Sequence, residues 1–315
     1  MKNKYKLIKI ISVNLIIIFV LLILTEFLLN LNQFIGCLRF IPQEEKKHYD
    51  YVGAYLNKVR NDYNKTKFYD KEFRPFPNNE EDLPSILVFG CSYAYGTNLK
   101  DNETISAKLS EATGLPVYNL GIQGGGIREI LHMLQNDKLY KYLGENHFNK
   151  NKVKYVIYLY QGDHQKRIFT SLRRPLVPNY KEKGNELVFQ PIKNRFWEMC
   201  VINKTVQEMY FSKYLYKIHP DKCFERLALY VNEIDRIIHD RLKNGDEQTK
   251  LIVLDYHDWG NEDWSKVNSD IEVIKIKELA KIDIGELPYI VMEGDDHPSA
   301  LVWELTMPIL ASRLN

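Results

Sequence analysis

A single serine stands at the point where a buried strand is expected to end. The segment Ile86–Gly96 passes from strand-forming residues into a tight glycine turn that presents Ser92. Nucleophiles are commonly placed at the carboxyl end of a buried strand. Gly90 permits a sharp turn, and Gly96 removes a side chain that would crowd a group approaching Ser92. Glycine and serine after a strand also form ordinary turns, so this segment indicates chemistry only if the chain supplies partners for it.

Acyl transfer requires a base for the nucleophile's proton and a carboxylate that orients the base. The late segment Gly294–Ser299 contains both residue types. We predict that His297 is the base and that Asp295, two positions earlier, accepts a hydrogen bond from one imidazole nitrogen. Asp296 is interpreted as a neighbour with no orienting role. An isolated Asp-x-His sequence is more often a surface turn, so the prediction depends on Ser92 and His297 meeting across a shared crevice.

The third requirement is a set of donors for the oxyanion. The segment Val117–Gly126 begins with an expected strand and ends in three consecutive glycines. A glycine-rich loop lets peptide N–H groups approach a tetrahedral centre closely. We therefore expect the backbone N–H of Ser92 and that of a glycine in this loop to form the oxyanion site.

Strand and helix patterns alternate along the part of the chain that carries these groups. The helix expected at 221–242 has an apolar stripe with helical spacing. The alternation predicts an α/β fold, a three-layer α/β/α sandwich with a mainly parallel sheet. The expected strands are 85–89, 117–119, 153–160 and 251–256, with short or edge strands at 271–274 and 289–292. The expected helices are 101–113, capped by Asp101 or Asn102, then 127–135, 221–242 and a final segment that begins near His297.

Two regions lack this alternation. Residues 32–84 are polar and tyrosine-rich, and we interpret them as an extracytoplasmic tether, with some helix, that packs on the domain. Residues 171–219 predict an insertion with a small β element followed by a helical stretch near 196–216. An insertion beside the carboxyl edge of a sheet usually shapes substrate access. The hydrolase-like domain is expected to span residues 85–315.

The amino-terminal residues predict a membrane segment. Lysines at positions 2, 4, 6 and 9 precede Ile10–Leu24, a run with only two polar residues. The next apolar residues extend this span to the roughly 20 that a bilayer requires. A cleaved signal peptide is the alternative, but no small-x-small cleavage site follows. We expect residues 1–31 to hold one uncleaved transmembrane helix that contacts the lipid bilayer through residues 10–31. Its N-terminus is then cytoplasmic, and the remaining chain lies in a bacterial periplasm or at the cell surface.

Charge and cysteine content restrict the other classes of function. The chain has 43 basic and 41 acidic residues, and four of the basic ones precede Ile10. The rest therefore has no basic excess, which argues against a nucleic-acid partner. The four cysteines have no metal-ligand spacing, and we predict neither a metal nor a cofactor. Cys200 and Cys223 are either a disulfide or two free thiols, and the sequence leaves both open.

Three sequence blocks resemble the SGNH/GDSL hydrolase family. The first is Phe89–Gly96, with Cys91 where the usual Asp would stand, and the second is Tyr118–Gly124. The last is Asp295–Pro298, an Asp shortly before a His that is followed by Pro. The resemblance implies Ser92 as nucleophile and Gly124 as the second oxyanion donor. It covers residues 85–315 through these blocks, with 171–219 unmatched.

The family pattern has a further block between the second and the last, and the chain departs from the pattern there. The family has an oxyanion Asn after a strand, and here Gly162 occupies that place. The side-chain donor is therefore missing, and Gln161 or His164 is the candidate substitute. Four residues are expected to line the site: Tyr93, which follows the nucleophile, and Gln161, Gly162 and His164.

Together these patterns predict a membrane-anchored serine esterase. Membrane-tethered members of the family often act on carbohydrate, so the resemblance implies an O-acyl, chiefly O-acetyl, ester on carbohydrate as substrate. One alternative is an O-acyltransferase that passes the same Ser92 intermediate to a sugar hydroxyl of a cell-envelope or secreted polysaccharide. The other is a catalytically impaired glycan-binding or assembly subunit, which the loss of the Asn at Gly162 makes plausible. Acyl-chain identity and oligomeric state are not readable from the sequence.

Overall fold

The structure is a computed structural model. It describes residues 73–79, 81–169, 179–183, 186–190, 220–256, 262–282, 284, 287–292 and 295–314. The predicted membrane segment, most of the predicted tether and the expected helix within 196–216 lie outside these residues. Within them, no helix combines the length and the apolar character needed to cross a membrane.

Five strands form one sheet in which every neighbouring pair is parallel. The order β2-β1-β3-β6-β7 matches the flavodoxin-like type of doubly wound sheet. The predicted parallel α/β fold is therefore confirmed. The three central strands are almost wholly buried, as expected for aliphatic runs covered on both faces. The strands are β1 (Ser85–Gly90), β2 (Val117–Gly121), β3 (Val153–Tyr160), β6 (Lys250–Asp255) and β7 (Glu272–Lys275).

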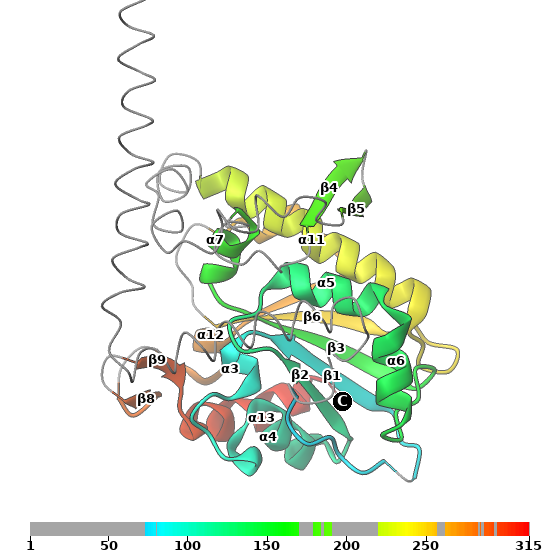
Figure 1. Cartoon of the computed structure of the whole chain (residues 1–315). Coiled ribbons are helices and arrows are strands. Elements are labelled where there is room, and N and C mark those ends of the chain that lie inside the picture. Colours follow the sequence, from blue (N-terminus) through cyan, green and yellow to red (C-terminus); the bar gives the residue numbers. More distant parts are fainter. Residues whose placement is uncertain are drawn as a thin grey trace, which may run out of the picture.

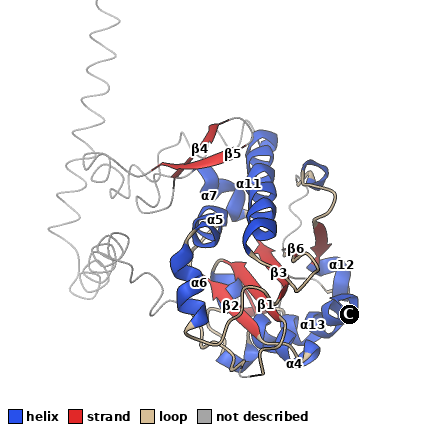
Figure 2. Cartoon of the chain, turned by 90° about the vertical axis from the view of Figure 1, so that its right-hand side faces the viewer, coloured by secondary structure: helices blue, strands red, loops and turns tan. Residues whose placement is uncertain are grey.

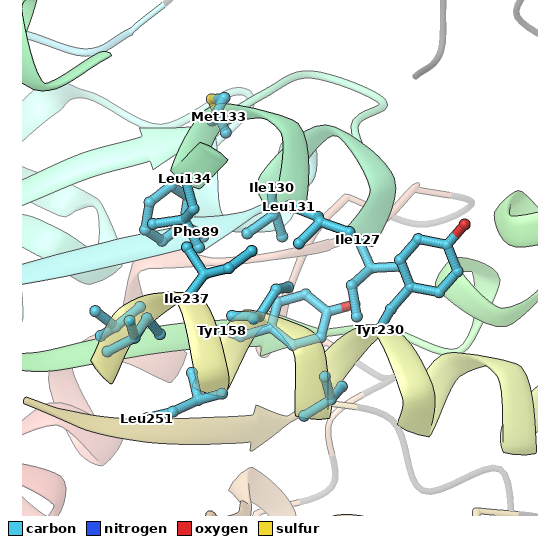
Figure 3. Packing of buried hydrophobic residues seen from close by; sticks show 14 of the residues in the cluster. Phe89, Ile127, Ile130, Leu131, Met133, Leu134, Tyr158, Tyr230, Ile237 and Leu251 are labelled. Carbon is cyan, nitrogen blue, oxygen red and sulfur yellow. The ribbon is translucent and has the colours of Figure 1, made fainter. Parts of the chain in front are cut away.

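Helices cover both faces of the sheet, which lies between them (Figures 1 and 2). One layer contains α5 (Ile127–Gln135), α6 (Asp137–Gly144) and α11 (Pro220–Arg241). The other contains α4 (Ile105–Thr113) and α13 (Ala300–Leu314). In Figure 3, side chains of α5 and α11 pack over Phe89 of β1 and Tyr158 of β3. A separate buried cluster on the opposite face joins Ile157 to Trp303 of α13.

Several predicted boundaries are correct and several are wrong. The expected 127–135 helix and 153–160 strand match α5 and β3. The predicted cap at Asp101 or Asn102 is wrong, because those residues form the 3-10 helix η1 (Asp101–Glu103). Thr104 caps α4 instead, its side-chain oxygen accepting from the N–H of Ala107.

The final helix also begins later than predicted. His297 lies in strand β9 (Asp295–Pro298), which pairs antiparallel with β8 (Ile290–Met292), and α13 follows this hairpin. Another unexpected helix, α7 (Asp163–Phe169), follows β3.

The predicted β insertion is present as the hairpin of β4 (Asn179–Lys183) and β5 (Glu186–Gln190). Its Tyr180 is buried and lies edge-on to Tyr230 of α11, with 5.8 Å between the ring centroids. The remaining short elements are α3 (Ser92–Tyr95), η2 (Trp264–Lys266) and α12 (Ile276–Ala280).

Candidate active site

The predicted nucleophile lies on a four-residue helix directly after β1. Ser92 is the first residue of α3, so its backbone N–H has no acceptor within that helix. The turn before it is tight: a Cβ at Gly90 would lie 2.7 Å from Ala94 Cβ and 3.0 Å from the carbonyl oxygen of Leu159. Gly96 ends α3 in the left-handed conformation, and its N–H donates to the Ser92 carbonyl. The two glycines thus allow a hydroxyl to stand at the carboxyl edge of the sheet.

Strand β2 fixes the position of α3. The buried Asn119 side chain donates to the Ala94 carbonyl (2.9 Å) and contacts Ser106 Oγ (2.8 Å). Its own oxygen accepts from the N–H of Gly121 (3.0 Å). A Cβ at Gly121 would lie 2.3 Å from the backbone nitrogen of Tyr95, so only glycine lets α3 approach β2 this closely. Asn119 and Gly121 therefore hold the turn that carries Ser92.

The structure brings Ser92 and His297 together. His297 Nε2 lies 2.8 Å from Ser92 Oγ, a hydrogen-bond distance. The β8–β9 hairpin presents this histidine, and the N–H of Ser299 closes it by donating to the Tyr289 carbonyl (2.9 Å). A base within hydrogen-bond reach of a serine hydroxyl is the geometry that nucleophilic catalysis needs.

Tyr93 connects this histidine to the buried core. Its ring centroid lies 5.0 Å from that of His297 and 5.1 Å from that of Tyr256. Burial raises the pKa of Tyr93, and the nearby negative charge of Asp296 raises it further. The phenol therefore stays neutral. Asp296 contacts Tyr93, and Asp295 lies opposite Met292 in the hairpin. The orienting role of Asp295 stays a prediction.

The glycine-rich loop after β2 contains the expected second oxyanion donor. Gly124 has φ +64°, a left-handed backbone that favours glycine. The next residues fix the loop: Gly125 N–H donates to the Ile122 carbonyl (2.8 Å), and Gly126 N–H donates to Glu129 (3.1 Å). Arg167 of α7 donates to the Gly125 carbonyl (2.5 Å). Within the described part of the chain, no group accepts from the Gly124 N–H.

The candidate substitutes for the missing Asn have contacts of their own. Gln161 is buried, and its side-chain oxygen accepts from the N–H of Asp163 at the start of α7 (2.5 Å). His164 is fully buried, with Nδ1 2.7 Å from the Tyr158 hydroxyl. Gly162 is buried between them, and its carbonyl accepts from Gln165 N–H (3.2 Å). The Gln161 side chain thus binds the start of α7, and the His164 side chain contacts Tyr158 in the core beside β3.

Cys91, at the position of the family's Asp, is a buried free thiol. It belongs to the apolar cluster around Ile157 and Trp303. A small apolar side chain suits this site, where a carboxylate would need a buried partner. Within the described residues, no three His, Cys, Asp or Glu side chains form a metal-binding group.

Sequence reasoning missed two groups that hold the nucleophile turn. Asn119 lies inside the block Tyr118–Gly124, where the family resemblance implies a role only for Gly124, and Arg74 lies in the region interpreted as a tether. Arg74 donates to three backbone carbonyls at and after the end of α3. Asn119 could have been found as a polar residue in an otherwise apolar strand, whereas no local signal marks Arg74.

Comparison with known proteins gives weak likenesses only. No family model matches the chain, and no curated protein matches it. Solved structures similar to it include a putative lipolytic protein of the G-D-S-L family from Desulfitobacterium hafniense DCB-2, at 12% identity and TM-score 0.38, covering 74% of this chain and 99% of that one. Another is the lipase Lip_vut3 from a goat rumen metagenome, at 13% identity and TM-score 0.39, covering 73% and 99%.

A third similar structure is a carbohydrate esterase family 2 enzyme with a carbohydrate-binding domain from Corynascus thermopiles, at 10% identity and TM-score 0.36. The match covers 76% of this chain and 67% of that one. Because the TM-scores are low, the functional argument depends on the site geometry.

Proposed function

We propose that this protein is an SGNH/GDSL-type serine ester hydrolase. The observation that supports the proposal is the 2.8 Å separation of Ser92 Oγ and His297 Nε2, two groups from opposite ends of the domain. The two groups lie at the carboxyl edge of the parallel sheet, next to the point where the strand order reverses between β1 and β3, and this is where sheets of this type commonly bind their ligands.

The proposed reaction has two halves. In the first, Ser92 Oγ bonds to the ester carbonyl carbon while its proton passes to His297 Nε2. The C–O bond to the alcohol then breaks, and His297 returns the proton to the leaving oxygen. In the second half, water gives a proton to His297 and attacks the acyl carbon, and Ser92 leaves with that proton. Asp295 is proposed to orient the imidazole in both halves.

The proposed oxyanion site consists of the N–H groups of Ser92 and Gly124. Neither has a competing acceptor in the described chain, and both stand on backbone that glycines or Asn119 hold in place. One such donor is typically worth about 3 kcal/mol of transition-state stabilisation. With Gly162 in place of the family's Asn, one donor is missing, so we expect a slower enzyme than a full set of three would give.

The substrate and the location are further parts of the proposal. We propose an O-acetyl ester on carbohydrate, on the basis of the family resemblance of the sequence blocks. We also propose that residues 10–31 anchor the chain in a membrane with the catalytic domain outside the cytoplasm. Acetate release from glucose pentaacetate, compared with hydrolysis of p-nitrophenyl palmitate, tests the substrate class. Extraction of the full-length chain from membranes with carbonate, compared with a chain lacking residues 1–31, tests the anchor.

A fluorophosphonate probe tests the central proposal directly, since it labels an activated serine irrespective of the natural substrate. We expect labelling of the wild type, none of Ser92→Ala, and strongly reduced labelling of His297→Gln. Ser312→Ala is the matched control, because that exposed hydroxyl bonds only its own helix, at the Ile309 carbonyl. Equal labelling of all four proteins, or none of the wild type, would refute the proposal.

The same acyl-enzyme can pass its acyl group to a sugar hydroxyl instead of water. Adding a free sugar to the acetyl donor and measuring acetyl-sugar against acetate separates an acyltransferase from a hydrolase. A labelled protein that forms acetyl-sugar and no acetate would replace the hydrolase proposal with the transferase.

A further inference from the structure

We propose that Arg74, which precedes the first strand, is a positioning residue for the nucleophile Ser92. This inference rests on the proposed function, since it concerns the same serine. It assigns a catalytic consequence to residues 73–79, which the sequence alone presents as the end of a tether.

The guanidinium of Arg74 donates hydrogen bonds to three carbonyl groups at and after the end of α3. Nε donates to Tyr95 O (3.0 Å), and one terminal nitrogen donates to both Gly96 O (2.5 Å) and Leu99 O (2.9 Å). The last carbonyls of a helix have no acceptor role within it, so they need outside donors. Tyr95 is the last residue of α3 and Gly96 is its C-cap, so this single arginine binds the last helical carbonyl and the carbonyl of the cap.

Other contacts fix the direction of the Arg74 side chain. The guanidinium carbon lies 4.7 Å from the Tyr95 ring centroid, and the second terminal nitrogen lies 2.6 Å from Asp101 Oδ1. The arginine side chain is 16% exposed and that of Asp101 is 61% exposed. An ion pair to so exposed a carboxylate contributes little, so the three carbonyl contacts and the ring contact carry the positioning.

Two phenylalanines hold the backbone on either side of Arg74. The Phe76 ring centroid lies 5.4 Å from that of Tyr118 in β2 and 5.7 Å from that of Tyr142 in α6. Phe73 lies 5.9 Å from Phe76 and 6.4 Å from Tyr142. The segment is therefore attached to the domain core, and Arg74 reaches α3 from a fixed base.

The link from Arg74 to Ser92 is short. Ser92 O accepts from the N–H of Gly96 and of Thr97, both at 3.0 Å, and Arg74 holds the carbonyl of that same Gly96. Loss of the guanidinium would let residues 95–97 shift and carry Ser92 Oγ away from His297. A shift of about 1 Å at a reacting group can lower the rate about 100-fold.

The test compares Arg74→Ala and Arg74→Lys with Arg241→Ala. Arg241 is a matched control, because it also pairs with an aspartate (Asp137, 2.7 Å) and faces a tyrosine ring (Tyr140, 5.9 Å), yet it holds no carbonyl of α3. With a p-nitrophenyl acetate assay, we expect kcat to fall about 10- to 100-fold in both Arg74 variants, with KM within about threefold of wild type. Lysine keeps the charge but lacks the planar fork, so it should not restore kcat.

Hydrogen exchange at the Gly96 and Thr97 amides gives a readout that does not depend on activity. We expect faster exchange there in Arg74→Ala and wild-type exchange at β3 amides, which shows that the domain is folded. Wild-type kcat or full rescue by lysine, or unchanged exchange at Gly96 and Thr97, would overturn the inference. If the wild type shows neither turnover nor phosphonate labelling, the proposed function fails, and the exchange result still decides whether Arg74 holds the turn.

Discussion

Replacing Gly121 with alanine should displace Ser92 without changing the Ser92 or His297 side chains. A Cβ at this residue would lie 2.3 Å from the Tyr95 nitrogen, 2.7 Å from the Ala94 carbonyl carbon and 2.9 Å from the Tyr95 Cα. All three are backbone atoms of α3, so no flexible side chain can move aside. Ordinary contacts begin at 3.4 Å, so α3 must move away from β2 by about 1 Å.

This displacement has two calculable effects. Overpacking by one methyl group typically costs about 1–3 kcal/mol of unfolding free energy. A shift of about 1 Å at the reacting atom can lower kcat about 100-fold, because the 2.8 Å contact of Ser92 and His297 would stretch beyond hydrogen-bond reach. Most of the molecules would remain folded while most of the activity is lost.

Turnover of p-nitrophenyl acetate and urea unfolding measure the two effects on the same samples. Gly144→Ala is the matched control, since a Cβ there meets no atom within 4 Å, and it should retain wild-type kcat. If Gly121→Ala keeps kcat within about twofold of wild type while Gly144→Ala does too, the argument that β2 sets the position of the nucleophile is wrong.

Three further predictions concern polar groups that are buried or partly buried. Asn119→Ala leaves the Ala94 carbonyl without its donor and should lower the unfolding free energy by about 2–4 kcal/mol along with kcat, as measured by urea unfolding and ester turnover. Tyr155→Phe removes the bond that its hydroxyl donates to the Leu314 carbonyl; we expect a loss of about 1–2 kcal/mol in the same unfolding assay, with kcat unchanged, and no loss would mean that the bond contributes nothing. Burial lowers the pKa of His132 from its ordinary 6.5, so the folded protein binds fewer protons there than the unfolded chain and loses stability as the pH falls below 6.5. His132→Gln should reduce that loss when urea unfolding is compared at pH 5 and pH 7. The same loss in the variant and the wild type would contradict the prediction.

The sequence was sufficient to predict helices and strands where their hydrophobic pattern is local. The alternation in Val153–Tyr160 predicts β3, and the helix expected at 127–135 is α5, both with their observed bounds, because burial against the sheet decides both. The class of sheet also followed from the alternation of elements.

Prediction failed where polar contacts or distant pairing decide the structure. Gln161 precedes α7 and its side-chain oxygen accepts from the N–H of Asp163, the first residue of the helix, and His164 is buried within it. The sequence at the start of α7 therefore looks like a polar loop. The strand that carries His297 exists only because β8 pairs with it, and hydrophobic periodicity within the segment contains no sign of that partner.

For the candidate site, the sequence identified the candidate nucleophile and the candidate base but not the residues that hold them in position. Ser92 and His297 stand in short motifs of recognisable composition, and the structure brings them into contact. Gly121 and Arg74 act through close approach and long reach, which depend on the packed fold and on no local spacing.

The candidate base, His297, lies on the last hairpin before the final helix, whereas the candidate nucleophile, Ser92, begins α3 directly after the first strand of the sheet. A growing polypeptide therefore contains Ser92 long before His297 has been made. The proposed catalyst would remain inert throughout synthesis and would begin to work only after nearly the whole domain has been made and has closed upon itself. A premature stop anywhere upstream of residue 297 would leave a polypeptide without its proton acceptor, however well its sheet had formed.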